Sequence, residues 1–188
     1  MTVSEIMRDL VTYRNYFKSS GGGVTITGGE PFVQSGFMLE ILQQCRQQGI
    51  HTVVDTSGYT SEKTARKVLP YTDLVLMDMK GYWPQTFKEV TGVDQAKSMA
   101  FLNLTREMGI DVWIRYVLVP GLTDNLDEIQ EMKAFLDTFP NVKKIDVLPF
   151  HKHGEDKWAQ LKKFKYNLGD TPPPSKELVR QVRSMLAM

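Results

Sequence analysis

The feature that most constrains this chain is a regular alternation of short apolar β runs with longer amphipathic stretches. The β runs are rich in Val, Ile and Leu and show little polar alternation, which is typical of parallel strands buried on both faces. The predicted strands are Val24–Thr27, Thr52–Asp55, Leu74–Met79, Val112–Val119 and Lys144–Leu148. Repeated β-α connections of this length are right-handed crossovers, so the sequence predicts an α/β fold with a parallel sheet.

Helical periodicity fills the segments between these runs. Thr2 and Glu5 have the spacing of a capping box and begin a predicted helix over residues 3–18. Further helices are predicted at Phe37–Gln48, Glu62–Val68, Gln95–Met108, Asn125–Phe139, near Asp156–Lys163, and at Ser175–Leu186 with Ser175 as its N-cap. The pattern by itself suits either a doubly wound open sheet or part of a (β/α) barrel. No change of composition marks a boundary, so residues 1–188 read as one domain.

Charge and composition exclude several classes of protein. The net charge of +1 leaves no broad basic surface for nucleic acid. No apolar run is long enough to span a membrane. The single cysteine, Cys45, cannot form an internal disulfide, which is typical of a protein of the reducing cytoplasm. Its place within a predicted helix indicates a packed or surface thiol rather than a nucleophile.

Residues that carry chemistry gather where the predicted strands end. In parallel α/β folds, ligands bind beyond the carboxyl ends of the strands. The residues at these ends are Gly28, Gly29 and Glu30, then Asp55 and Thr56, then Asp78 and Lys80, then Arg115 within the fourth strand, and His151 after the fifth. The sequence therefore predicts a ligand site along this edge of the sheet.

The stretch Gly28-Gly29-Glu30 favours a cationic ligand. Two glycines let a backbone approach a ligand closely, whereas the carboxylate of Glu30 would repel a phosphate. An ammonium group or a cation suits this combination better. A tight strand-to-helix turn without any ligand is the simpler alternative.

The charged residues of the later strands also allow more than one interpretation. Asp55 and Asp78 end neighbouring strands, where they can share a cation, bind hydroxyl groups or cap the following helices. Asp78 and Lys80 lie on the same side of a strand and can form a local ion pair. Arg115 interrupts an apolar run, and a charge in a buried strand needs a partner.

Several motifs, in order, resemble a known family. They are SSGGGVTITGGEP, HTVVDTSGY, TDLVLMDMK, VWIRYVLVPGLTD and LPFHKHGEDKW, and together they run from about residue 3 to the end of the chain. This series resembles the radical S-adenosylmethionine (SAM) enzymes that activate glycyl radical enzymes, of the pyruvate formate-lyase type. The resemblance implies a partial parallel (β/α) barrel, with five of its six strands present here. It also implies SAM, a [4Fe-4S] cluster, and a 5′-deoxyadenosyl radical that takes a hydrogen atom from a glycine of the partner lyase.

The resemblance also implies a set of binding residues. Gly28, Gly29 and Glu30 match the motif that holds the amino group of SAM, and His151 matches a histidine that reaches SAM. Asp55 and Thr56 match a pair near the methionine end of SAM. Val117 and Leu148 match positions that line the adenine.

Further matches concern catalysis and a metal ion. Asp78 and Lys80 match a pair that contacts SAM and the backbone of the protein substrate, and Arg115 matches the arginine of W-I-R-Y. Asp55, Thr56, Asp78 and the carbonyl of Leu76 match a site for a monovalent cation.

The chain departs from the family in its cysteines. The family holds its cluster with the thiolates of a C-x-x-x-C-x-x-C motif, whereas these 188 residues contain one cysteine. We therefore expect the chain to lack the N-terminal cluster-binding segment and to be inactive by itself. A non-catalytic module that binds SAM or the lyase is one alternative, and an unrelated barrel enzyme using Asp55, Asp78 and Lys80 is another.

The same departure leads to an expectation about assembly. In the family, the strand that corresponds to Val24–Thr27 pairs with a strand that precedes it. Without that neighbour, Val24–Thr27 is predicted to form an exposed edge. Unpaired edges promote self-association, so we expect either self-association through Val24 and Ile26 or an edge covered by the N-terminal helix.

Overall fold

The computed structural model describes residues 1–153 and 167–188. Its helices are α1 (Val3–Thr12), α2 (Arg14–Ser20), α3 (Ser35–Gln47), α4 (Glu62–Val68), α5 (Pro84–Thr91), α6 (Ala96–Glu107), α7 (Leu126–Leu136) and α9 (Lys176–Met185), with 3-10 turns at Pro31–Gln34 and Leu69–Tyr71. Its strands are β1 (Gly23–Ile26), β2 (His51–Thr56), β3 (Leu74–Met79), β4 (Asp111–Leu118) and β5 (Val142–Pro149). The helix predicted near Asp156–Lys163 lies outside the described residues.

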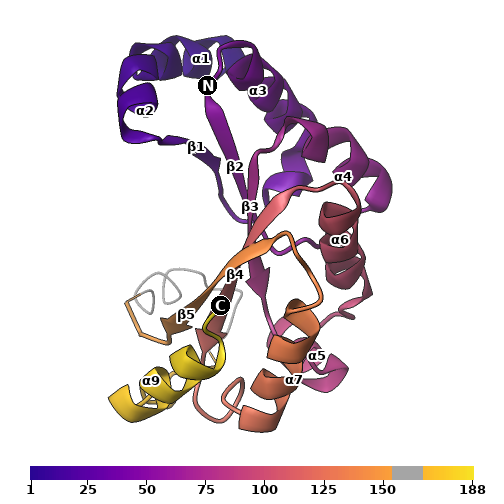
Figure 1. Ribbon diagram of the computed structural model, residues 1–188, viewed down its shortest axis with the longest axis vertical. Coiled ribbons are helices and arrows are strands. Elements are labelled where there is room, and N and C mark those ends of the chain that lie inside the picture. Colours follow the sequence, from indigo (N-terminus) through magenta and orange to yellow (C-terminus); the bar gives the residue numbers. More distant parts are fainter. Residues whose placement is uncertain (154–166) are drawn as a thin grey trace.

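The strands form one open parallel sheet in the order β1-β2-β3-β4-β5. The helices α3, α4, α6 and α7 lie along one face of this sheet (Figure 1). A doubly wound sheet would reverse its strand order and carry helices on both faces. The sequential order is the winding of a barrel that does not close, so the predicted α/β partial barrel is confirmed.

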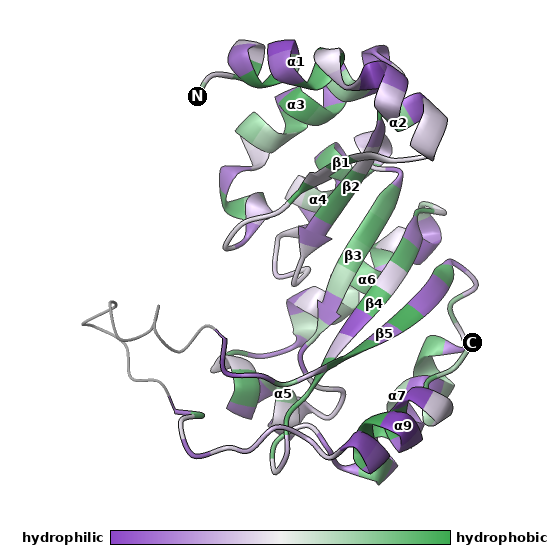
Figure 2. Ribbon diagram, turned by 90° about the vertical axis from the view of Figure 1, so that its left-hand side faces the viewer, coloured by the Kyte–Doolittle hydropathy of each residue, from purple (hydrophilic) through white to green (hydrophobic). Residues whose placement is uncertain are grey.

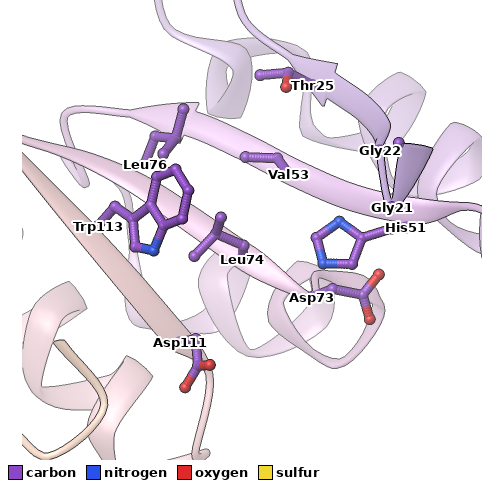
Figure 3. Close-up of a pocket in the computed structure, with 11 residues that line it drawn as sticks. Gly21, Gly22, Thr25, His51, Val53, Asp73, Leu74, Leu76, Asp111 and Trp113 are labelled. Carbon is purple, nitrogen blue, oxygen red and sulfur yellow. The ribbon is translucent and has the colours of Figure 1, made fainter. Parts of the chain in front are cut away.

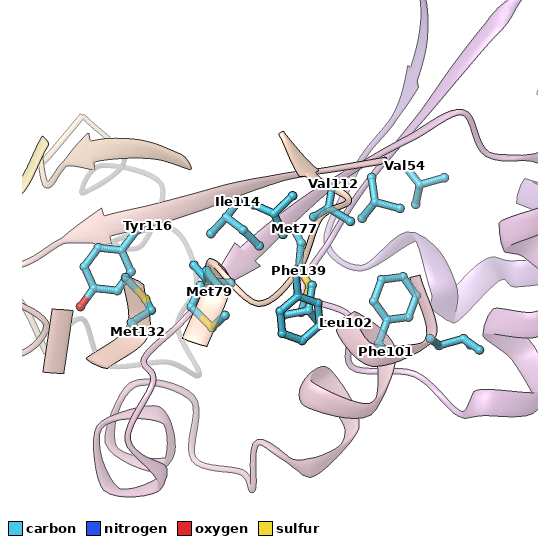
Figure 4. Packing of buried hydrophobic residues seen from close by; sticks show 14 of the residues in the cluster. Val54, Met77, Met79, Phe101, Leu102, Val112, Ile114, Tyr116, Met132 and Phe139 are labelled. Carbon is cyan, nitrogen blue, oxygen red and sulfur yellow. The ribbon is translucent and has the colours of Figure 1, made fainter. Parts of the chain in front are cut away.

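The hydrophobic core lies between the sheet and these helices. Every second residue of β4, namely Val112, Ile114, Tyr116 and Leu118, is buried, as are Val75, Met77 and Met79 of β3. Figure 4 shows the labelled side chains of β3 and β4 packed against Phe101, Leu102, Met132 and Phe139 from the helices and loops. The alternate residues of the strands point to the opposite, concave face, because the side-chain period of a strand is two. Figure 2 shows β3 as mostly apolar and β5 as interrupted by hydrophilic residues.

A smaller apolar cluster joins α1 to α3. It contains Val3 and Met7 of α1, Ile41 and Cys45 of α3, and Ile50 before β2. The predicted capping box begins α1, because the backbone N–H of Thr2 donates to Glu5 at 2.7 Å and that of Glu5 donates to the Thr2 hydroxyl. The N-terminal helix is thereby placed against α3.

Two helix predictions need correction. The single helix predicted over residues 3–18 is two helices, and helix α5 was not predicted. Tyr13, with φ −90° and ψ 0°, ends α1, and a separate helix α2 begins at Arg14. Helix α5 has a proline at its first turn and ends at Gly92, which has φ 75°. These are ordinary start and stop signals, but the short segment contains few apolar residues and so has a weak periodic pattern.

Strand β1 lies at the edge of the sheet, as predicted, and pairs with β2 alone among the described strands. Gly23 pairs with His51 so closely that a Cβ on Gly23 would lie 2.1 Å from the His51 carbonyl oxygen. The third glycine of the Gly21-Gly22-Gly23 run is therefore required by the contact between the two backbones. Self-association through β1 stays a prediction.

Replacing Gly23 with alanine should separate β1 from β2. Overpacking of this kind costs about 1–3 kcal/mol, and we expect the Gly23→Ala variant to lose at least that much free energy of unfolding in urea. Gly36 is the matched control, because a Cβ there meets no atom within 4 Å and the residue lies in α3. Gly36→Ala should stabilise the chain by about 0.5–1 kcal/mol. Equal effects of the two substitutions would contradict this account of Gly23.

Candidate functional site

Arg115 of β4 is the centre of a charged network on the concave face. Its Nε donates to Asp78 Oδ1 at 2.9 Å, and its Nη1 donates to Asp55 Oδ2 at 3.0 Å. Its Nη2 contacts Asp78 Oδ1 at 2.8 Å and also pairs with Asp55 Oδ1. The register explains this geometry, because Asp78 lies directly opposite Arg115, whereas Asp55 lies on the strand beyond β3. One planar guanidinium thereby joins the carboxyl ends of three strands.

Two further residues extend the network. Lys80 donates from Nζ to Asp78 Oδ2 at 2.8 Å, and the hydroxyl of Thr27 donates to Asp55 Oδ2 at 3.1 Å. The side chains of Asp55 and Asp78 are 16% and 20% exposed. Since both carboxylates are largely removed from water, their pairing with cations is needed for stability.

Glu30 forms a second, separate centre next to this network. Its Oε1 accepts from the Thr56 hydroxyl at 2.7 Å and from Phe32 N–H at 3.2 Å. Its Oε2 accepts from the hydroxyl and N–H of Ser57 at 2.6 Å and 3.0 Å. No ion pair of Glu30 is found in the described part of the chain, so neutral donors hold this carboxylate and its charge is not balanced by a cation.

The other predicted residues lie along β4 and β5. Val117 and Leu148 are paired in register, and Leu148 is 39% exposed. His151 follows the end of β5, where its ring packs at a right angle against the ring of His153 with centroids 4.4 Å apart. Among the described residues, no hydrogen bond or ion pair joins His151 or His153 to Arg115. The structure therefore does not bring His151 into the charged network.

The concave face is hollowed beneath the charged network. A cavity of about 450 Å³ is lined by residues from β1 to β4, and Figure 3 shows Val53, Leu74, Leu76 and Trp113 across its floor. Asp73 and Asp111 lie at the amino ends of the strands beside it. Leu76 of the cavity lining pairs in register with Asp55, so the cavity lies next to the network.

The structure separates the interpretations that the sequence left open. Asp55 and Asp78 are paired with Arg115 and cap no helix, so the capping alternative is wrong. The local ion pair of Asp78 and Lys80 and the partner expected for Arg115 are both confirmed. No group of three or more His, Cys, Asp or Glu side chains in residues 1–153 and 167–188 is arranged to hold a metal ion.

The sequence reasoning assigned no role to two residues of the site, namely Thr27 and Ser57, although both lie at the strand ends where a ligand was expected. Thr27 is the next residue in the register that pairs Ile26 with Val54, which places it beside Asp55. Ser57 follows Thr56 directly and supplies two of the donors to Glu30. Both lie next to motifs that were recognised, so the parallel register was the signal that could have found them.

The residues around Glu30 fit a ligand that carries an ammonium group, as SAM does. A Cβ at Gly28 or Gly29 would meet no atom within 4 Å, so the turn before Glu30 faces open space. The unbalanced charge of Glu30 favours a cation there. Its four accepted hydrogen bonds fill the usual capacity of a carboxylate. Binding of an ammonium group would therefore replace a hydroxyl donor or act through charge alone.

The thiol in these residues does not fit an iron–sulfur cluster. Cys45 is fully buried between α1 and α3, and its Sγ lies 4.0 Å from Met7 Sδ. Burial raises the pKa of the Cys45 thiol, which disfavours the thiolate that a metal requires. Cluster ligation therefore has no support from the side chains described here.

None of the described helices is long and apolar enough to cross a bilayer.

The model of the family described as "Radical SAM superfamily" matches residues 1–136 of this chain. The chain is 35% identical over 188 residues to the pyruvate formate-lyase 1-activating enzyme of Escherichia coli (strain K12), covering 99% of this chain and 76% of that protein. It is 37% identical over 186 residues to the pyruvate formate-lyase-activating enzyme of Clostridium pasteurianum, covering 99% and 77%.

Solved structures agree with these relatives. A domain of pyruvate-formate lyase-activating enzyme from Bacteroides vulgatus ATCC 8482 is similar with a TM-score of 0.72 and 27% identity, covering 88% of this chain and 92% of that one. A radical SAM methyltransferase from Sphaerobacter thermophilus has a TM-score of 0.69 at 15% identity, covering 99% and 55%. At that identity, the second likeness concerns the fold alone.

Removing the guanidinium should destabilise the chain through its two carboxylates. Arg115→Met leaves Asp55 without a cation and Asp78 with Lys80 as its cation. Breaking a buried pair of this kind costs about 3–5 kcal/mol, less where water still reaches it. We expect a loss of about 2–3 kcal/mol in urea unfolding, part of which Asp55→Asn restores in the double variant. Arg66, whose side chain is 44% exposed beside Glu62 and Glu107, is the control. A stability change in Arg66→Met as large as that in Arg115→Met would count against this interpretation.

The thiol of Cys45 should react only when α1 separates from α3. Since burial raises its pKa and excludes solvent, we expect negligible alkylation by iodoacetamide at pH 8 in the folded chain and complete alkylation in denaturant. Met7→Ala should accelerate the alkylation, because Met7 covers the sulfur.

Anaerobic reconstitution with iron and sulfide should leave the chain without a stoichiometric cluster. Rapid alkylation of the native chain, or near-complete cluster loading, would show that Cys45 is accessible.

Proposed function

Since the chain belongs to the radical SAM superfamily, we propose that it serves in the activation of pyruvate formate-lyase, as the part that binds SAM and the lyase. In this activation, a glycine of the lyase loses a hydrogen atom and becomes a glycyl radical. This reaction is that of an oxidoreductase of the radical SAM type. The protein substrate would be the glycyl radical enzyme. The identity of 35–37% to activating enzymes over almost the whole chain supports this proposal.

The single observation that carries the proposal is the network of Arg115, Asp55, Asp78 and Lys80 at the carboxyl ends of the strands. Two carboxylates and two cations balance there, and the pairing fixes Lys80 at the edge of an open concave face. A fixed ammonium group and a neighbouring carboxylate can together bind the C=O and N–H groups of an extended peptide. We assign Asp78, Lys80 and Arg115 to contact with the lyase backbone and its glycine.

The same proposal assigns the SAM contacts. Gly28, Gly29 and Glu30 would receive the amino group, and Asp55 and Lys80, which belong to the same charged network, would contact the methionine end. Val117 and Leu148 present an apolar surface to the adenine, and His151 would approach from the end of β5. When bound and reduced by one electron from a [4Fe-4S] cluster held by other residues, SAM would supply the 5′-deoxyadenosyl radical that removes the glycine hydrogen atom, whereas these side chains would bind and orient SAM.

A monovalent cation at Asp55, Thr56, Asp78 and the carbonyl of Leu76 stays a prediction. Both carboxylates already accept from Arg115, and the Thr56 hydroxyl donates to Glu30. A cation would have to share these oxygens with the guanidinium. We therefore expect such an ion to bind weakly unless Arg115 turns away when the lyase binds.

A second candidate is a non-catalytic module that binds SAM or the lyase without radical chemistry. One observation favours it, namely that the thiol of Cys45 is buried between α1 and α3 and is not available as a cluster ligand. Both candidates share the binding surface described above, and both suit a cytoplasmic protein. The alternative of an unrelated barrel enzyme is wrong, because the chain belongs to the radical SAM superfamily.

The proposal predicts specific binding of the lyase through Lys80. A synthetic peptide that spans the radical-bearing glycine of pyruvate formate-lyase should bind to the chain in calorimetry, and Lys80→Met should weaken it about tenfold, which corresponds to ~1.4 kcal/mol. Lys143→Met is the matched control, since Lys143 is exposed and does not belong to the network. Its Nζ lies 3.6 Å from Asp111 Oδ1. SAM by itself should bind weakly, and Glu30→Gln should weaken it further.

Two results would contradict the proposal. One is the absence of peptide binding to the unaltered chain, with and without SAM. The other is an equal loss of affinity in Lys80→Met and Lys143→Met, because this would show general attraction by positive charge rather than a defined contact.

A further inference from the structure

Glu128 is a buried carboxylate that the site described above does not use. It lies in the first turn of α7 and is 1% exposed. Removing a carboxylate from water is costly unless donors replace the lost hydration. The donors that Glu128 uses therefore show what it stabilises.

These donors come from the loop that follows β3. Glu128 Oε1 accepts from the N–H of Tyr82 at 2.7 Å and of Trp83 at 2.9 Å, and Oε2 accepts from the Thr86 hydroxyl at 2.7 Å. These groups begin α5, and its N-cap, Trp83, makes no capping hydrogen bond with its own side chain. Glu128 therefore supplies the cap of α5 from a neighbouring helix, at the backbone that directly follows Lys80.

The local sequence would place Glu128 in a different role. Asn125 is the N-cap of α7, and its side chain accepts from Glu128 N–H at 3.1 Å. In a capping box, a glutamate at this third position reaches back to the N–H of the N-cap, as Glu5 does to Thr2 in α1. The carboxylate of Glu128 crosses to α5 instead. The contact between α7 and the loop after β3 thus takes the place of a local cap.

We propose that Glu128 is a positioning residue for Lys80. Tyr82 lies two residues after Lys80, so the hydrogen bond to its N–H restricts the backbone that carries the lysine. The ammonium group is thereby held on Asp78, at 2.8 Å, and at the edge of the concave face. The importance of this positioning for binding of the lyase rests on the function proposed above. Preorganisation of this kind strengthens binding, because the loop does not have to be ordered when the ligand arrives.

The first test measures Lys80 directly and does not depend on any ligand. Acetylation of Lys80 by acetic anhydride is followed by mass spectrometry and compared with Lys144 of the same molecule, which pairs with Asp146 at 2.7 Å. Glu128→Gln should accelerate the acetylation of Lys80 several-fold and leave Lys144 unchanged. An unchanged Lys80 rate in a folded Glu128→Gln variant would overturn the proposal.

Two further variants make this test robust. Thr86→Val removes one donor but leaves the carboxylate with two, so this chain should fold and show a smaller acceleration in the same direction. Glu131→Gln is the matched control, because the exposed Glu131 lies on the same helix and, within residues 1–153 and 167–188, accepts only from the indole of Trp83, at 2.8 Å. We expect it to leave Lys80 unchanged. An effect of Glu131→Gln equal to that of Thr86→Val would contradict a specific role of Glu128.

The second test separates positioning from general stability. Binding of the glycine-loop peptide is measured for the unaltered chain, Glu128→Gln, Lys80→Met and the double variant. If Glu128 acts through Lys80, the single Glu128→Gln substitution should weaken peptide binding about three- to tenfold relative to the unaltered chain. In a chain that already carries Lys80→Met, Glu128→Gln should not weaken peptide binding any further. Equal losses in both backgrounds would overturn the proposal. If the unaltered chain does not bind the peptide, the proposed function fails, and the acetylation rates still decide the role of Glu128.

Discussion

The structure depends on the burial of one face of a parallel sheet under helices that all lie on the same side. Every second residue of the inner strands enters the core, and the residues between them must point to the concave face. Asp55, Asp78 and Arg115 belong to this second set. The alternation that builds the core therefore also delivers the charged side chains to one shared surface. Because these side chains are largely shielded from water, each must find a partner on another strand.

The parts of the fold that could be predicted from sequence are those with strong local signals. The five strands are apolar runs, and their parallel arrangement follows from the helices between them. The position of Arg115 within such a run already required a partner, and the carboxyl ends of the strands gave the candidates. The sequence did not reveal that one guanidinium would join both Asp55 and Asp78, because this depends on the register of β2, β3 and β4.

Other features depend on tertiary contacts that no local pattern records. Residues 3–18 contain neither glycine nor proline, so nothing in the sequence marks the end of α1 at Tyr13. Glu128 has the spacing of a local cap, yet its carboxylate binds the start of α5, because the residues before this helix and its first turn offer three donors close to it. In both places the packing between elements, rather than local preference, decides the outcome.

The charges of the site suggest why this edge of the sheet suits a cationic cofactor. Arg115 and Lys80 balance Asp55 and Asp78, so that network attracts neither sign strongly at a distance. Glu30 is held by hydroxyl and amide donors and keeps its negative charge unbalanced among the described residues. SAM carries positive charge on both its sulfonium and its ammonium group. Under the function proposed above, a single unbalanced carboxylate beside a neutral network would draw such a ligand to the Glu30 end, and the paired side chains of Lys80 and Asp78 would meet the peptide backbone.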